Sequence, residues 1–86
     1  MKIKEGLVLR EAAGSFIVMN TRGDLSFNGM ITLNETGAFI WNCIEEGLTE
    51  EEIASKITDI YDIDRETAVR DLKIFKEKMS GAGIIE

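Results

Sequence analysis

The hydrophobic pattern of this chain changes near residue 33, and that change constrains the fold more than any other feature. Before it, apolar residues form short runs typical of β-strands, separated by glycine-containing turns. After it, apolar residues recur every three or four positions, as in amphipathic helices. Because the chain has only 86 residues, we expect residues 1–86 to form one domain around one small core.

Short strands are predicted in the first third of the chain. They are expected at Leu7–Arg10, Ser15–Met19 and Leu25–Phe27, with a turn region at residues 11–14. The second strand is apolar on both faces, which indicates a position between neighbouring strands or under a helix. Asn28 and Gly29 form either a hairpin turn leading into Met30–Leu33 or the loop that leaves the sheet, and we favour the exit loop.

Two helices with recognisable N-terminal signals are predicted next. Thr32 or Asn34 can cap the first, which ends near Glu46. Apolar residues nearly all round it indicate a central, buried helix. The second helix begins with a capping box formed by Thr49 and Glu52, and it carries one apolar stripe.

A third helix is predicted from just after Asp64 to about Ala82. One face carries the expected core stripe, which consists of Ala68, Leu72, Phe75 and Met79. Ile74 falls nearly opposite that stripe, and Val69 lies on its flank. The predicted fold class is therefore α+β and winged helix-turn-helix-like, with a three-stranded antiparallel sheet followed by a three-helix bundle.

Several residue types are scarce, and their scarcity excludes classes of chemistry. The chain has no His and one Cys, so it lacks the residues for a Cys/His zinc site or a His-dependent catalytic triad. We expect no cofactor, no metal and no enzymatic activity, and we expect Cys43 to be a small buried side chain. The net charge of −6 argues against nucleic acid as a partner. Neither a signal peptide nor a membrane span is recognisable, so a cytoplasmic location is expected.

One distinctive segment is Leu33–Trp41, in which Leu-Asn-Glu-Thr-Gly precedes an apolar helix with a Trp. Further distinctive segments are Leu25–Gly29, Gly47–Ile53, Tyr61–Asp64, Thr67–Leu72 and Gly81–Ile85. Together these segments, which cover almost the whole chain, resemble the pyrroloquinoline quinone biosynthesis protein D (PqqD) family, and Leu33–Trp41 is the most specific of them. The resemblance implies a winged-helix-like peptide-recognition element that binds the leader of a ribosomally synthesised precursor peptide. Such an element presents the leader to a modifying enzyme, often a radical S-adenosylmethionine enzyme.

The resemblance also implies where the leader would bind. It would add as a strand to the edge of the sheet and lie beside the third helix, because a sheet edge offers unpaired backbone groups. The expected peptide-binding residues are Leu25, Ser26, Phe27 and Asn28 on the strand and Val69, Arg70, Lys73 and Ile74 on the helix. This mixed basic and apolar strip would suit an acidic, amphipathic leader, although a single exposed Ile such as Ile74 is common on protein surfaces.

Two other functions fit the same pattern of elements. A winged-helix DNA-binding regulator shares the architecture, but its recognition helix should be strongly basic, and here acidic residues offset the Lys and Arg of the third helix. An accessory scaffold detached from a larger enzyme is the other alternative. An open sheet edge would also allow two copies to pair as a homodimer.

Overall fold

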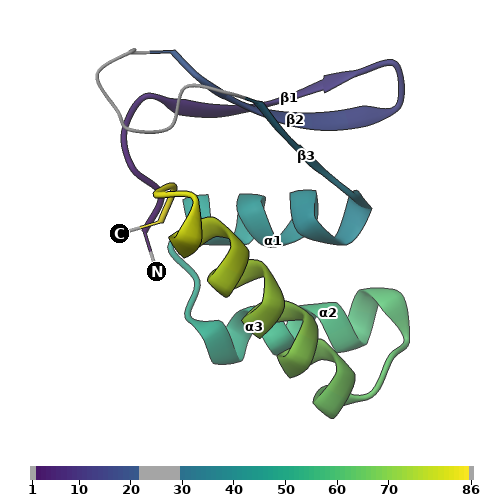
Figure 1. Cartoon of the computed structure of the whole chain (residues 1–86). Coiled ribbons are helices and arrows are strands. Elements are labelled where there is room, and N and C mark those ends of the chain that lie inside the picture. Colours follow the sequence, from purple (N-terminus) through teal and green to yellow (C-terminus); the bar gives the residue numbers. More distant parts are fainter. Residues whose placement is uncertain (1, 22–29, 86) are drawn as a thin grey trace.

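The computed structural model describes residues 2–21 and 30–85 and shows three antiparallel strands followed by three helices (Figure 1). The elements are β1 (Leu7–Ala12), β2 (Ser15–Asn20), β3 (Met30–Leu33), α1 (Glu35–Glu45), α2 (Glu50–Tyr61) and α3 (Arg65–Gly81). This order confirms the predicted α+β class. No helix in the described part of the chain combines the length and the apolar character that a membrane crossing requires.

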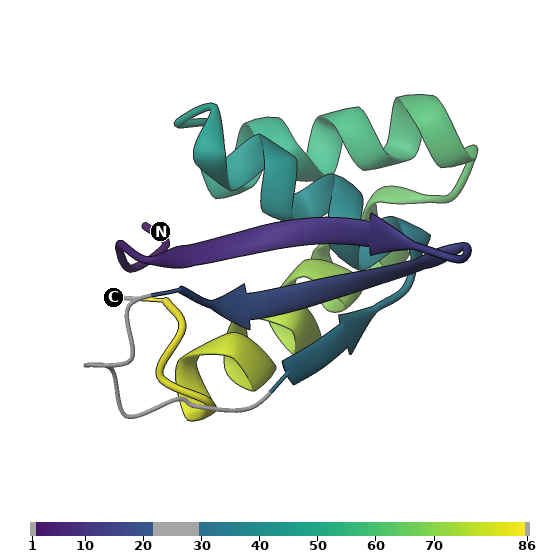
Figure 2. The same ribbon diagram turned by 90° about the horizontal axis from the view of Figure 1, so that it is seen from above.

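The sheet lies over the helices as a separate layer, with strand order β1-β2-β3 (Figures 1 and 2). Leu7 pairs with Asn20 at one end of β1, and Phe16 of β2 pairs with Leu33 of β3. β2 lies between the other two strands, as its apolar sequence indicated, and its Met19 is nevertheless 39% exposed. Its Val18 is completely buried against the helical layer.

The hairpin between β1 and β2 is tighter than the sequence indicates. Glu11 and Ala12 belong to β1, so only Ala13 and Gly14 form the connection. Their φ angles are +52° and +80°. Positive φ at both central residues is the requirement of a type I′ turn, whose twist matches that of the strands it joins.

The third strand of the sheet differs from the sequence-based expectation. The predicted strand Leu25–Phe27 lies outside the described residues. The exit-loop interpretation was wrong for Met30–Leu33, because these four residues pair with β2 in the register Met30–Met19 to Leu33–Phe16. Leu33 is buried and Thr32 is exposed. The alternation of a short strand is a weak signal, and pairing with β2 together with burial of Leu33 stabilises it here.

Asn34, rather than Thr32, caps α1. Its side-chain oxygen accepts a hydrogen bond of 2.8 Å from the backbone N–H of Gly37. A Cβ atom at position 37 would lie 3.2 Å from that oxygen and 3.3 Å from the Cβ of Leu33. Gly37 therefore lets the end of β3 pass close against the first turn of α1, which leaves a single residue between the strand and the helix.

The cap of α2 and the starting point of α3 are those predicted, and Asp64 caps α3. Thr49 and Glu52 form the capping box, with hydrogen bonds of 2.9 and 3.1 Å between backbone N–H groups and side-chain oxygens. The carboxylate of Asp64 accepts a hydrogen bond of 2.7 Å from the backbone N–H of Thr67. These bonds lower the pKa of both Glu52 and Asp64, because they favour the ionised carboxylates.

The core lies between the sheet and α1 and extends down between the helices. Trp41 and Ile40 of α1 are almost completely buried, as predicted for a central helix. After α3 the chain turns back, so that Ile84 and Ile85 are also buried. The carbonyl of Ile84 accepts a hydrogen bond of 2.9 Å from the N–H of Lys4, which brings the two ends of the chain together (Figure 1).

Candidate functional site

Helix α3 exposes large apolar side chains on two of its sides. Ile74 is 57% exposed, in agreement with its predicted position opposite the core stripe, and Val69 is 47% exposed. They are five positions apart in the sequence, which places them about 140° apart around the helix axis. Leu72 and Phe75 are buried, so they anchor α3 to the rest of the molecule. Each exposed side chain lines a different groove.

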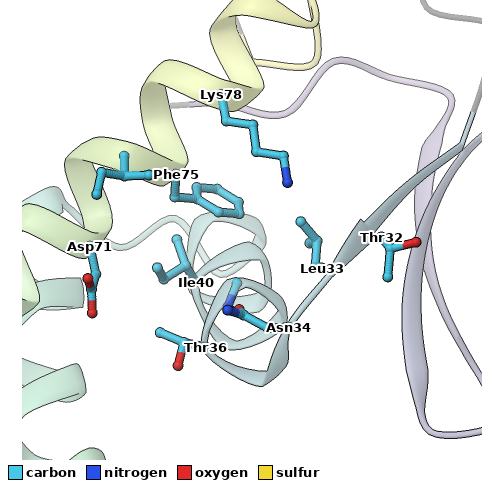
Figure 3. Close-up of a pocket in the computed structure, with 10 residues that line it drawn as sticks. Thr32, Leu33, Asn34, Thr36, Ile40, Asp71, Phe75 and Lys78 are labelled. Atoms are coloured by element: carbon cyan, nitrogen blue, oxygen red, sulfur yellow. The ribbon is translucent and has the colours of Figure 1, made fainter.

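The first groove lies between β3, the start of α1 and α3, and we call it the β3–α3 groove. Its volume is about 400 Å³. The residues that line it are Thr32, Leu33, Asn34, Thr36, Gly37, Ile40, Asp71, Ile74, Phe75 and Lys78. Figure 3 shows Leu33, Ile40 and Phe75 facing one another from the strand and both helices, whereas Thr32 points away from them.

The floor of the β3–α3 groove is apolar and continuous with the core. Leu33, Ile40 and Phe75 line the groove although each exposes only a few per cent of its surface. Ile74 contributes a largely exposed aliphatic side chain to the same groove. The groove is therefore shaped by side chains that packing holds in place, and a ligand side chain entering it would meet a preformed apolar surface.

One wall of this groove is a sheet edge. β3 is the last strand in the order β1-β2-β3, so in the described part of the chain it pairs with β2 on one side only. The other side presents backbone N–H and C=O groups of Ile31–Leu33 that no described strand pairs with. An extended peptide can pair with such groups while its side chains enter the groove beside the strand.

Two charged side chains of α3 also line the β3–α3 groove. Asp71 is partly buried and Lys78 is exposed, and they lie on opposite sides of the Phe75 ring (Figure 3). Neither forms an ion pair or a hydrogen bond through its side chain with another described residue. Both charges are therefore available to a ligand.

The second groove lies between α2 and α3, and we call it the α2–α3 groove. Its volume is about 370 Å³, and its lining residues are Glu50, Glu51, Ala54, Arg65, Val69, Leu72, Lys73 and Lys76. Two ion pairs join its walls. Lys76 Nζ lies 3.2 Å from a carboxylate oxygen of Glu50, and an Arg65 guanidinium nitrogen lies 3.8 Å from one of Glu51.

The structure divides the predicted helical strip between these grooves. Ile74 lines the β3–α3 groove, whereas Val69 and Lys73 line the α2–α3 groove. Arg70 is exposed and lines neither groove, and its positive charge acts on Asp64 at the start of α3. The strand residues that were predicted to bind peptide lie outside the described residues, and they are Leu25, Ser26, Phe27 and Asn28.

Sequence reasoning missed two of the α3 side chains in the β3–α3 groove, because neither Asp71 nor Lys78 was singled out. Phe75 was predicted as a core residue with partial exposure at the groove floor. A signal was present, because Asp71, Ile74, Phe75 and Lys78 follow the i, i+3, i+4, i+7 spacing of one helix face. On the strand side, Thr32 and Leu33 were missed because the third strand was placed too early.

The thiol of Cys43 is buried. Cys43 exposes only 3% of its surface, and burial raises the pKa of its thiol. The thiol is therefore protonated at neutral pH, which agrees with its predicted role as a small apolar side chain. Within residues 2–21 and 30–85, no cluster of acidic or Cys side chains is arranged to hold a metal ion.

Comparison with known proteins identifies a family whose model matches most of this chain. The model of the family described as coenzyme PQQ synthesis protein D (PqqD) matches residues 15–85. That match spans β2, β3 and all three helices, and so it includes every described residue of the β3–α3 groove. None of the curated protein sequences matches this chain.

Two solved structures share the fold. TbiB1, solved in complex with the TbiA(beta) leader peptide, is 28% identical, with a TM-score of 0.84 over 100% of this chain and 95% of that one. A lasso peptide synthetase B1 complexed with its leader peptide is 18% identical, with a TM-score of 0.83 over 99% of this chain and 95% of that one. At that lower identity the second likeness concerns the fold alone.

Proposed function

This chain belongs to the PqqD family, and we propose that it binds the leader of a ribosomally synthesised precursor peptide in the β3–α3 groove. The observation that carries the proposal is the position of a sheet edge, which no described strand pairs with, beside a preformed apolar groove. TbiB1, which shares the fold along the whole chain, was solved with a leader peptide bound, and this supports the proposal.

Strand addition is the binding mode that suits this groove. A leader segment in an extended conformation would pair with the open edge of Ile31–Leu33, which gives affinity that depends little on sequence. Alternate side chains of the segment would then point toward Leu33, Ile40 and Phe75. The backbone supplies most of the affinity in this mode, and the groove supplies the selectivity.

We also propose that the protein performs no chemistry itself and acts as an adaptor. Because the groove would hold only a short segment of the leader, the rest of the precursor would remain free to enter the active site of a separate enzyme. The family resemblance implies that this enzyme modifies the precursor peptide, and that it is often a radical S-adenosylmethionine enzyme. In a reconstituted mixture, removal of the adaptor should slow modification of the full precursor and leave a leaderless substrate unaffected.

The direct test is titration of ¹⁵N-labelled protein with a synthetic leader of the precursor encoded beside this gene. Amide signals of Ile31–Leu33 and of Asp71–Lys78 should shift together and saturate. A scrambled peptide of the same composition is the matched control. Shifts confined to the α2–α3 groove would contradict the proposed site, and the absence of any shift would contradict the proposed function.

A second experiment isolates the binding mode. In a strand, successive backbone N–H groups point in opposite directions, so only alternate amides of the leader would pair with β3. Two leader peptides with N-methyl groups on alternate sets of amides should therefore differ in affinity, with one bound much as the parent peptide and the other weakly. Equal affinities of the two would exclude strand addition.

The open edge of β3 also suggests weak pairing of two copies. If the same edge served both purposes, dimers formed at high protein concentration would dissociate when leader peptide is added. Sedimentation velocity with and without a twofold excess of the leader measures this competition, and a dimer that persists in the presence of bound peptide would place its interface elsewhere.

A further inference from the structure

We infer that the β3–α3 groove selects peptides by the order of their charges, with a basic residue toward the peptide N-terminus, an apolar residue in the middle and an acidic residue toward the C-terminus. Asp71 would contact the basic residue and Lys78 the acidic one. This inference rests on the proposed function and specifies the chemistry of the peptide that the groove binds.

The spacing of the two charges on α3 matches a short extended segment. Asp71 and Lys78 are seven residues apart, which is two helical turns and about 10.5 Å along the axis. Phe75 lies between them and faces the same groove (Figure 3). In an extended peptide, residues two apart lie about 6.7 Å from each other and residues four apart about 13 Å. A five-residue segment with charges at its ends and an apolar residue at its centre therefore spans the groove.

The two charges lack partners within the described part of the chain, although partners are present nearby on the same helix. On the other side of α3, Lys76 pairs with Glu50 and Arg65 pairs with Glu51. Asp71 and Lys78 form no such pair with a described residue. Because Asp71 is also partly buried, a peptide cation beside it would be attracted more strongly than by a fully exposed carboxylate.

The direction of the peptide follows from the directions of β3 and α3. The C-terminal end of β3 leads into α1, and Asp71 lies on the side of Thr36 in the first turn of α1 (Figures 1 and 3). The C-terminal half of α3, with Lys78, lies toward the start of β3 (Figure 1). Antiparallel pairing is the more stable and the more frequent arrangement. An antiparallel peptide has its N-terminus at the Asp71 end, so its basic residue precedes its acidic one.

The test exchanges charges on both molecules. Affinities are measured by fluorescence anisotropy for the wild-type protein, Asp71→Lys, Lys78→Asp and the double variant. The probes are the synthetic leader of the neighbouring precursor and a copy in which its basic and acidic flanking residues are exchanged. Each single variant should bind the leader about three- to tenfold more weakly, and the double variant should prefer the exchanged peptide.

A matched control separates local contacts from overall charge. Lys56→Asp makes the same change in net charge as Lys78→Asp, at an exposed position on α2 that lines neither groove. It should change affinity less than Lys78→Asp does. Circular dichroism of all variants verifies that they are folded.

The outcomes separate the inference from the function on which it rests. If the leader binds the wild-type protein and the double variant does not prefer the exchanged peptide, selection by charge order is overturned while peptide binding stands. If the wild-type protein prefers the exchanged peptide, the proposed direction is overturned. If no leader binds the wild-type protein, the proposed function and this inference both fail.

Discussion

The two sides of α3 carry similar residue types but differ in what those residues contact. On the α2 side, the ion pairs Lys76–Glu50 and Arg65–Glu51 join four of the five charged lining residues across the groove, and the fifth is Lys73. On the β3 side, Asp71 and Lys78 are unpaired among the described residues, and the neighbouring strand has an open edge. In the α2–α3 groove, most charged groups are already paired within the protein, as in an ordinary contact between two helices. In the β3–α3 groove, the charged groups can still pair with a ligand.

The largest expected effects are on the free energy of unfolding. They test whether the floors of both grooves belong to the hydrophobic core. Phe75 lies under the β3–α3 groove and Leu72 under the α2–α3 groove, and both are buried. Phe75→Ala should lower the free energy of unfolding by about 3–5 kcal/mol and Leu72→Ala by about 2–5 kcal/mol. Urea denaturation measures both values. A loss below about 1 kcal/mol for Phe75→Ala would show that the floor of the β3–α3 groove is not part of the core.

The next largest effect is on the affinity for the leader peptide, and it shows which of the two grooves the leader occupies. Ile74→Asp places a charge in the β3–α3 groove and should weaken leader binding by about tenfold or more, which corresponds to about 1.4 kcal/mol. Val69→Asp makes a comparable change in the α2–α3 groove and should weaken binding far less. Both side chains are exposed, so the thermal unfolding temperatures should stay close to that of the wild type. Equal losses of affinity would mean that the peptide contacts Val69 as well as Ile74, as expected from the sequence.

A smaller effect concerns the ion pairs that cross the α2–α3 groove. A double-mutant cycle with Lys76→Ala and Glu50→Ala should give a coupling energy of about 0.2–1 kcal/mol, because both side chains are about half exposed. The coupling should decrease as salt is added. A cycle with Lys78→Ala and Asp71→Ala should give no favourable coupling in the absence of peptide. A coupling of similar size there would mean that the two grooves do not differ in charge pairing.

The smallest expected effect is the pH dependence that arises from the cap of α3. Hydrogen bonding to Thr67 lowers the pKa of Asp64 below its unfolded value. Its stabilising contribution is therefore present above the unfolded pKa of about 3.9 and is lost as the pH falls through the lower, folded pKa. Asp64→Asn keeps a capping side chain but does not titrate. Urea denaturation between pH 7 and pH 2.5 should show a smaller acid-induced loss of stability for this variant, and identical profiles would contradict the assignment.

The helices could be predicted from sequence because their signals are local. The capping box of Thr49 and Glu52 involves atoms three residues apart, and the same holds for Asp64 and Thr67. The exposure of Ile74 followed from helical geometry alone. By contrast, β3 exists because residues 30–33 pair with residues 16–19, a contact between separate segments that composition does not encode.

The site could be predicted only in outline for the same reason. Helical geometry shows that Val69 and Ile74 lie on different sides of α3, but it does not show which side faces β3. That choice depends on how α3 packs against α1, where Phe75 and Ile40 meet in the groove floor. The family resemblance indicated a sheet edge and the third helix, and the structure has a groove between β3 and α3, while the helix residues that line this groove required the packed structure.

The contact between the chain ends has a consequence for how this domain can be combined with others. Ile3 pairs with Ile85, and Lys4 binds Ile84, so the polypeptide enters and leaves the fold at one place. A domain with adjacent ends can be inserted into a loop of a host protein, or circularly permuted, without stretching its core. Joining the two ends by a short linker and opening the chain at the exposed Ala13–Gly14 turn should therefore give a permuted protein that keeps the β3–α3 groove. Such a protein would allow the same groove to be attached to a host enzyme in more than one orientation.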